Sequence, residues 1–176
     1  MKLLLDLFNK FGSYAHITIF FLSVYLLSNK DNLLFYFIVG FVVNKILNLV
    51  LKGIFQQPRP SEDIKTFNLA LEHGKRFIFK DGMPYDIFGM PSGHAQTVLF
   101  STAFVYFALR NKKILYLYLL ISVITLCQRV VFKHHTIAQV LAGAFIGALF
   151  GYFVYYLSGE KMKGHIREKL DDFGPF

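Results

Sequence analysis

The chain has 176 residues, of which 55% are hydrophobic and 17% charged, and its formal net charge is +8. Soluble globular proteins carry about 25% charged residues, so this composition excludes a disordered chain and a cytosolic Rossmann enzyme, and the single Cys127 excludes an intramolecular disulfide. Much of the positive charge lies at the ends of apolar runs, which argues for membrane flanks or anion sites and against nucleic acid as a partner.

Residues 1–11 have an amphipathic pattern ahead of the first long apolar run. The apolar face carries Leu3, Leu4, Leu7, Phe8 and Phe11. This pattern is typical of a helix lying in the membrane interface, and equally of the start of the first membrane span. Asp6 and Lys10 interrupt it, and no small-residue cleavage site follows, so we expect no cleavable signal peptide.

Five apolar runs follow, and at about 1.5 Å per residue most of them are long enough to cross a hydrocarbon core of about 30 Å. They comprise residues 14–28, 33–51, 92–109, 114–132 and 136–157. So many runs leave too little polar chain to cover them in water. The sequence therefore predicts an all-α, polytopic membrane helix bundle with about five transmembrane helices, forming a single domain over residues 1–176.

A segment of about forty residues, 52–91, connects the second and third predicted spans and holds four of the five prolines. Long loops in compact domains are usually functional or disordered. This segment contains a Lys-Asp-Gly turn at residues 80–82 and apolar pieces at residues 67–71 and 77–79. We therefore expect an ordered capping loop over one face of the membrane.

Basic and polar residues gather at the helix ends that strict alternation of the spans places on one face of the membrane. These are Lys52, Arg59, Ser92, Gly93, His94, Arg129, His134 and His135. Three cations with no comparable run of carboxylates make an anion site, and phosphate is the best candidate. Ser92 is expected to cap a helix whose free N–H groups point at the anion. Each cation taken alone could instead reach to lipid headgroups.

Two histidines beside a phosphate site suggest a division of labour, because one can attack phosphorus while the other protonates the leaving oxygen. Phosphoryl-transfer metals require carboxylate ligands, and the neighbouring acidic residues lack ligand spacing. Those residues are Glu62, Asp63, Asp81 and Asp86. We therefore expect no metal and no cofactor.

Three motifs formed by these residues resemble the signature of the type 2 phosphatidic acid phosphatase superfamily, which contains membrane lipid phosphatases and soluble haloperoxidases. They are Lys52-x6-Arg59-Pro60, then Pro91-Ser92-Gly93-His94, then Gln128-Arg129-x5-His135-x3-Gln139, within a core of residues 44–151. The resemblance implies phosphate binding by Lys52, Arg59, Ser92, Gly93 and Arg129. It also implies that His135 is the nucleophile forming a phosphohistidine, that His94 is the acid, and that Gln139 orients His135. His134 lies off the motif spacing and is expected to be an interfacial polar residue.

Two positions depart from the family pattern, since Gln128 replaces a Ser and Gln139 replaces an Asp. A Gln oxygen can hold the imidazole tautomer, but it cannot stabilise positive charge as a carboxylate does. Residues 88–96 and 135–140 are similar to the dolichyl diphosphatase-like branch, in which Gln takes this place. The resemblance implies a metal-independent phosphatase acting on a lipid phosphate or an isoprenyl (dolichyl-type) diphosphate. The alternative is a catalytically impaired relative that binds anionic lipid headgroups without turnover.

Two further stripes of residues leave alternatives open. Asn44, Lys45 and Asn48 share one side of the second predicted helix with Lys52, and they either line a headgroup passage or form hydrogen bonds between helices. Small residues at four-residue spacing allow helices to approach closely, either inside the bundle or in an oligomer. They are Gly143, Gly147 and Gly151.

The positive charge opposite the predicted site sets the expected orientation in the membrane. It comprises Lys30, Arg110, Lys112, Lys113 and the tail residues Lys161, Lys163, Arg167 and Lys169. Positive charge in short loops marks the cytoplasmic side. We therefore expect a multi-pass membrane protein, surrounded by membrane lipids, with its site on the lumenal or extracytoplasmic side.

Overall fold

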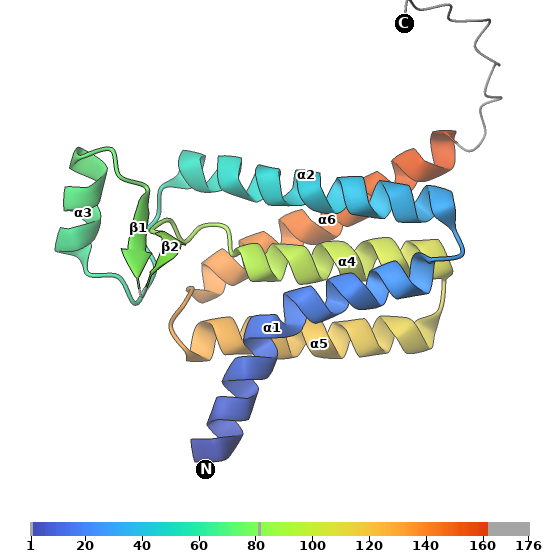
Figure 1. Ribbon diagram of the computed structural model, residues 1–176, viewed down its shortest axis with the longest axis horizontal. Helices are drawn as coiled ribbons and strands as arrows, with labels where there is room; N and C mark the ends of the chain where they lie inside the picture. The colour runs from blue at the N-terminus through green and yellow to red at the C-terminus, as the bar shows by residue number, and fades with distance from the viewer. Residues whose placement is uncertain (1, 81, 162–176) are drawn as a thin grey trace, which may run out of the picture.

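The computed structural model describes residues 2–80 and 82–161 and consists of long helices lying side by side, with a small mixed segment beyond one end (Figure 1). The elements in chain order are α1 Lys2–Leu27, α2 Asp31–Phe55, α3 Ile64–Glu72, β1 Phe77–Lys80, β2 Met83–Asp86, α4 Gly93–Leu109, α5 Lys112–Val131 and α6 Ile137–Lys161. The predicted helical bundle is confirmed in outline. The tail cations from Lys163 onward lie outside the described residues.

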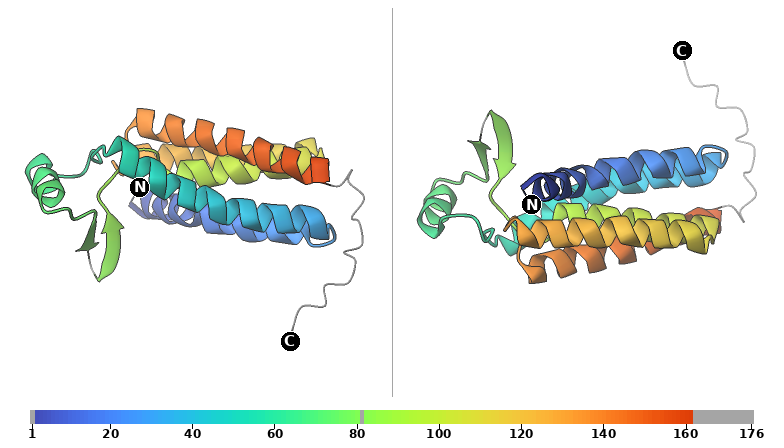
Figure 2. Two further views of the ribbon diagram at one scale, coloured as in Figure 1. Left: turned by 90° about the horizontal axis from the view of Figure 1, so that it is seen from above. Right: turned by 90° about the horizontal axis from the view of Figure 1, so that it is seen from below.

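Four helices of the described chain, α1, α2, α5 and α6, are long and apolar enough to cross a membrane. The remaining long helix, α4, has 17 residues and packs against all four of them. Its residues are buried along its whole length, so it forms the centre of the bundle (Figure 2). The chain is thus an integral membrane protein, and a fifth crossing by α4 stays a prediction.

The N-terminal amphipathic helix expected ahead of the first span does not exist as a separate element. Residues 2–27 form one continuous helix of 26 residues, whose first turns lean away from the bundle (Figure 1). Gly12 lies where α1 crosses α5, and a Cβ there would come within 2.5 Å of the Gln128 side chain. The amphipathic pattern therefore belongs to the start of α1, because residues 9–14 contain no proline and the single Gly12 costs only about 1 kcal/mol of helix propensity.

The segment between α2 and α4 is folded and includes β-structure, which corrects the all-α prediction. Asp63 caps α3 by accepting a hydrogen bond from the Thr66 N–H at 3.0 Å. Strands β1 and β2 then pair antiparallel, with Phe77 opposite Asp86. The expected turn at residues 80–82 contains Asp81, which lies outside the described residues. Figure 2 shows the segment beyond the end of the bundle, and its role as a cap over the membrane stays a prediction.

The three glycines of α6 pack against α4, so of the two roles left open for them, packing inside the bundle is the one observed. A Cβ at Gly147 would collide with the backbone carbonyl of Gln96, and Gly143 and Gly151 approach α4 in the same way. The ridge is therefore used inside the bundle, where small residues let two backbones touch. This close contact also brings the first turn of α6 to the start of α4, where the Ser92 N–H donates to the Gln139 carbonyl at 2.9 Å.

Candidate functional site

Most of the basic residues predicted to form a site gather at one end of the bundle, where α2 and α5 end and α4 and α6 begin. Lys52, Arg59 and Arg129 come from three separate segments. The positive charge of each opposes protonation of the His135 imidazole. His135 also interacts electrostatically with His94, which lies in the first turn of α4. The structure thus brings together the three cations and the two histidines that the sequence places in separate motifs.

The His135 ring is held in one orientation by a backbone carbonyl. Its Nδ1 lies 2.9 Å from the Gly89 oxygen and 3.3 Å from the Gln139 Oε1. A carbonyl oxygen can only accept, so Nδ1 carries the hydrogen and Nε2 keeps a free lone pair. The sequence does not predict this partner, because any residue can supply a backbone carbonyl.

The environment of His135 keeps the imidazole uncharged. Burial, followed by the charges of Arg59 and Arg129, lowers the pKa of His135 to about 3. The pKa of His134 is lowered to about 4 by burial and the same two charges. At neutral pH both rings are therefore neutral, and a neutral imidazole is the nucleophilic form.

Gln139 forms hydrogen bonds both to the turn before α6, which carries His135, and to the segment that carries Arg59. Its Oε1 accepts from the Thr136 N–H at 3.2 Å, and its Nε2 donates to the Pro58 carbonyl at 2.9 Å. It also packs against Gly89, where a Cβ would come within 2.8 Å of the Gln139 amide. A carboxylate at this position has no hydrogen to donate to Pro58. The bond to Pro58 therefore requires the amide of Gln139.

Buried donors at this end of the bundle are left without partners. The Nε atoms of Arg59 and Arg129 have no hydrogen-bond partner among the described residues, and neither has the Oγ of Ser92. Ser92 stands at the N-cap position of α4 but makes no capping bond with its side chain, which corrects the expected role. Buried polar groups are normally hydrogen-bonded, so these three donors mark a place where an anion fits.

Lys52 is already paired in this structure, through a carboxylate that the sequence did not single out. Its Nζ donates to the Phe88 carbonyl at 2.7 Å and lies 3.4 Å from Asp86, which also accepts from Arg76. Burial raises the pKa of Asp86, but the hydrogen bonds from Arg76 and the charge of Lys52 outweigh it and hold the pKa below its ordinary value. Asp86 therefore remains charged and joins β2 to α2.

The side chains of Gln128, Asn44 and Asn48 lie against neighbouring helices. The Gln128 side chain donates to Asn9 at 2.7 Å and so faces α1. Asn44 and Asn48 both bond to the Gln96 side chain of α4, at 2.9 and 2.8 Å. Of the two roles considered for these asparagines, hydrogen bonding between helices is the one observed. Gly93 packs on Asn48, where a Cβ would come within 3.0 Å of the amide oxygen.

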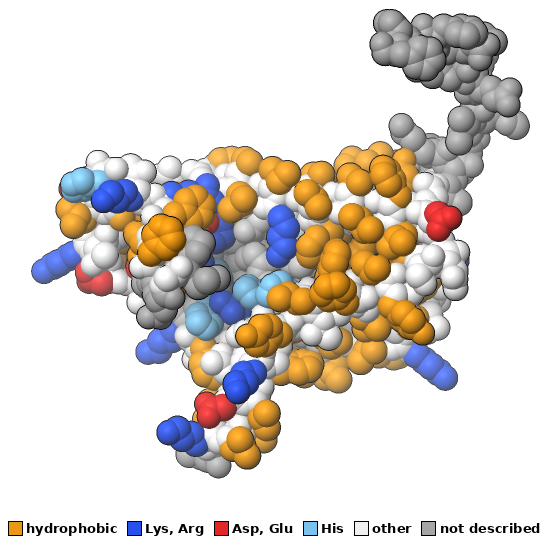
Figure 3. All heavy atoms as spheres, in the orientation of Figure 1, with side chains coloured by type: hydrophobic (Ala, Val, Ile, Leu, Met, Phe, Trp, Pro, Cys, Tyr) orange, Lys and Arg blue, Asp and Glu red, His pale blue; other side chains and the backbone are white. Residues whose placement is uncertain are grey.

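His94 has a neighbour that the sequence did not assign to the site. The His16 ring of α1 meets the His94 ring edge-on, with centroids 4.2 Å apart. Lys45 and Arg129 are the cations whose charges act on both rings. Figure 3 shows basic and histidine side chains gathered in a hollow of this face, bordered by hydrophobic side chains.

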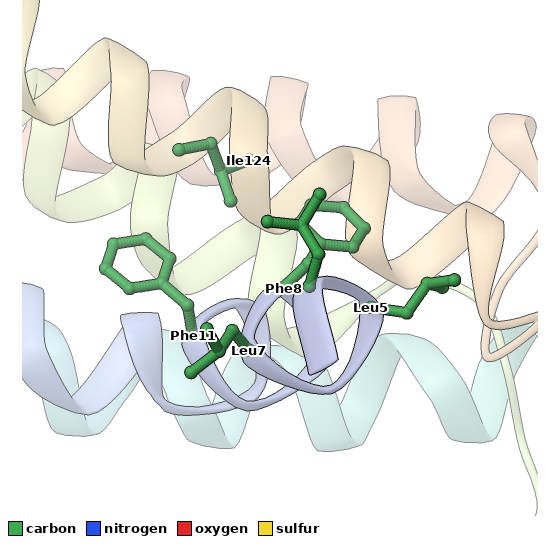
Figure 4. A pocket seen from close by; sticks show the side chains of 6 residues that line it. Leu5, Leu7, Phe8, Phe11 and Ile124 are labelled. Carbon is green, nitrogen blue, oxygen red and sulfur yellow. The ribbon is translucent and has the colours of Figure 1, made fainter. Parts of the chain in front are cut away.

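A separate hollow of about 550 Å³ lies between the start of α1 and α5 (Figure 4). Its lining consists of Leu4, Leu5, Leu7, Phe8, Phe11 and Ile124. These side chains offer no polar group for binding an anion or moving a proton. The chemistry therefore belongs to the basic end of the bundle.

Comparison with known proteins supports this assignment of fold. Residues 33–163 match the PAP2 superfamily. Among solved structures, the chain is similar to the transmembrane PAP2-type phosphatidylglycerolphosphate phosphatase of Bacillus subtilis, with a TM-score of 0.55, 18% identity, and coverage of 95% of this chain and 90% of that one. No curated protein sequence matches the chain.

Proposed function

Since the chain belongs to the PAP2 superfamily, we propose that it is a membrane phosphatase that hydrolyses a lipid phosphate or an isoprenyl diphosphate. The observation that carries this proposal is the His135 imidazole, neutral and oriented by Gly89, beside the unpartnered donors of Arg59 and Arg129. Phosphoryl transfer requires a nucleophile and hydrogen-bond donors that bind the phosphate oxygens near it.

In the proposed mechanism the substrate phosphate occupies the space between the two arginines. Arg59 and Arg129, with Lys52, Ser92 and the Gly93 backbone, bind its oxygens, and the His135 Nε2 attacks phosphorus. The resulting phosphohistidine is held by the Nδ1–H bond to the Gly89 carbonyl, which faces the positive charge that develops on the ring. His94 gives its proton to the leaving oxygen, and water then releases inorganic phosphate.

Gln139 supports placing the chain near the dolichyl diphosphatase-like branch. Its amide forms hydrogen bonds with both His135 and Pro58, so the residue fits its surroundings and need not be a defective replacement for Asp.

No step of the proposed mechanism uses a metal ion. The positive charge at the opposite end of the bundle supports a site on the lumenal or extracytoplasmic side.

The test is phosphate release by the purified protein in detergent, measured with and without EDTA. The substrates are a polyprenyl diphosphate, phosphatidylglycerol phosphate and phosphatidic acid, with wild type, His135→Ala and, as a matched control, His73→Ala at the exposed end of α3. We expect wild type and His73→Ala to be active, and His135→Ala to lose at least about 10³-fold in kcat.

Two results would contradict this proposal. Full activity of His135→Ala would remove the nucleophile, and loss of wild-type activity on adding EDTA would contradict a metal-free reaction. Binding of anionic lipid headgroups with no turnover of any substrate would instead support the impaired relative.

A further inference from the structure

His16, Lys45 and His94 form a second basic cluster that none of the family motifs accounts for as a group. The residues come from α1, α2 and α4. The two imidazoles lie with centroids 4.2 Å apart, and the charge of Lys45 acts on both of them. The Nδ1 of His16 is buried.

Lys45 has no counter-ion within the described part of the chain. The salt bridges found there join Asp86 to Lys52 and to Arg76. The Lys45 ammonium lies 5.4 Å from the Phe41 ring centroid on the same helix. A cation on an apolar membrane helix is costly without a partner and usually marks a path or site for an ion or a charged substrate.

The position of this cluster relative to His135 indicates which part of a substrate it meets. In the proposed reaction, His135 attacks from one side of the phosphorus and His94 faces the leaving oxygen on the other. Because the His16 ring contacts His94 and the charge of Lys45 acts on both rings, we assign His16 and Lys45 to the leaving-group side. An alcohol leaving group carries no charge for Lys45 to bind, whereas a lipid monophosphate leaving group does.

We propose that His16 and Lys45, with His94, form a second phosphate subsite that binds the phosphate attached to the lipid, so that the preferred substrate is a lipid diphosphate. This inference rests on the proposed function. The His135 Nε2 forms a bond to the terminal phosphorus, and the bond from that phosphorus to the bridging oxygen breaks. The bridging oxygen leaves with the lipid monophosphate, and water then cleaves the phosphohistidine to inorganic phosphate.

The first experiment compares two substrates that share one tail, farnesyl diphosphate and farnesyl monophosphate, with wild type, Lys45→Met, Lys45→Arg and Lys112→Met. Lys112 lies exposed at the start of α5, at the opposite end of the bundle, and serves as the matched control. We expect Lys45→Met to lower the ratio of kcat/KM for diphosphate to that for monophosphate at least about 10-fold, the loss of one charge-assisted contact. Lys45→Arg should restore most of this ratio, and Lys112→Met should leave it unchanged.

An unchanged ratio in Lys45→Met would overturn the second subsite, whether both activities fall together or neither falls. Absence of phosphate release from both substrates by wild type would instead overturn the proposed function, so the two failures are distinguishable.

A second measurement uses wild type alone and remains decisive if Lys45→Met does not fold. The rise of Tm in detergent is titrated with methylenediphosphonate and with inorganic phosphate. We expect half-saturation by methylenediphosphonate at a concentration at least about 10-fold lower. Equal concentrations for the two ligands would overturn the subsite.

Discussion

Gln139 illustrates how a residue that departs from a family pattern can still fit its site. Its oxygen accepts from Thr136 and lies 3.3 Å from the His135 Nδ1, while its nitrogen donates to Pro58. The closer partner of His135 is the Gly89 carbonyl at 2.9 Å. The shorter bond to the imidazole therefore comes from a backbone group, and Gln139 adds a second, longer one while also joining two loops.

Replacing Gln139 by Asp tests how much the protein depends on the amide at this position. Gln139→Asp removes the hydrogen donated to Pro58 and places a carboxylate among buried groups, which should lower Tm and reduce kcat about 10-fold. Thermal unfolding in detergent and phosphate release are the measurements. Activity gained by Gln139→Asp would show that the native amide is a defect, as expected for a catalytically impaired relative.

His135 also gives the protein a stability that depends on pH. Its pKa of about 3 in the folded protein lies below the ordinary value of about 6.5 in an unfolded chain. Between these two values the unfolded chain binds more protons, so the stability is fully present above pH 6.5 and falls as pH decreases toward 3.

This dependence is testable by comparing wild type with His135→Asn. Because of His135, the free energy of unfolding should be about 2 kcal/mol lower at pH 5 than at pH 7.5. This difference corresponds to a fall in Tm of about 5 °C. The variant should show a smaller fall over the same range, while His134 contributes equally to both proteins. Equal falls in Tm would contradict a neutral buried His135.

At the scale of elements, the contact between α4 and α6 holds the site together. The three glycines of α6 touch the α4 backbone, and this contact places Gln139 beside the Ser92 N–H. Because α4 supplies His94 and the turn before α6 supplies His135, the distance between the two histidines depends on this packing.

A methyl group added to the ridge should therefore disturb both stability and chemistry. Gly147→Ala places a Cβ against the Gln96 carbonyl, and overpacking of this kind costs about 1–3 kcal/mol. Gly159→Ala is the matched control on the same helix, since its Cβ would meet nothing within 4 Å. We expect lower Tm and lower kcat for Gly147→Ala alone; equal Tm values for the two variants would refute the close contact.

At the scale of the molecule, the two ends of the bundle differ in chemistry. One end holds the site histidines, Arg59 and Arg129, and the segment with α3 and the hairpin, while the other has the tight links after α1 and α4 (Figure 1). The exposed cations Lys30, Lys112 and Lys113 lie at the second end. The positive-inside rule therefore predicts that this end faces the cytoplasm.

The orientation can be tested by labelling single cysteines in intact cells with a membrane-impermeant maleimide, in a Cys127→Ala background. We expect Ser61→Cys, in the exposed connection after α2, to be labelled from outside. Lys30→Cys, in the link before α2, should be labelled only after the membrane is permeabilised. The reverse pattern would place the site on the cytoplasmic side.

The sequence by itself determined the helices and most of the residues that we propose for the site. The long apolar runs specify helices because length and composition act locally, and the motifs with Arg59, His94 and Arg129 can be read in order along the chain. It could not fix where α1 begins, because an amphipathic pattern fits both an interfacial helix and the first turns of a span. Nor did it predict the hairpin, whose strands are only four residues each.

Only the tertiary structure decided which groups touch. The partner of His135 is a carbonyl 46 positions away, and the partner of Lys52 is a carboxylate on a strand of the hairpin. His16 lies outside every motif, yet its ring contacts His94. Such contacts depend on how the helices are rotated and shifted against one another. That packing follows from the close fit of whole helix surfaces, which no single stretch of sequence specifies.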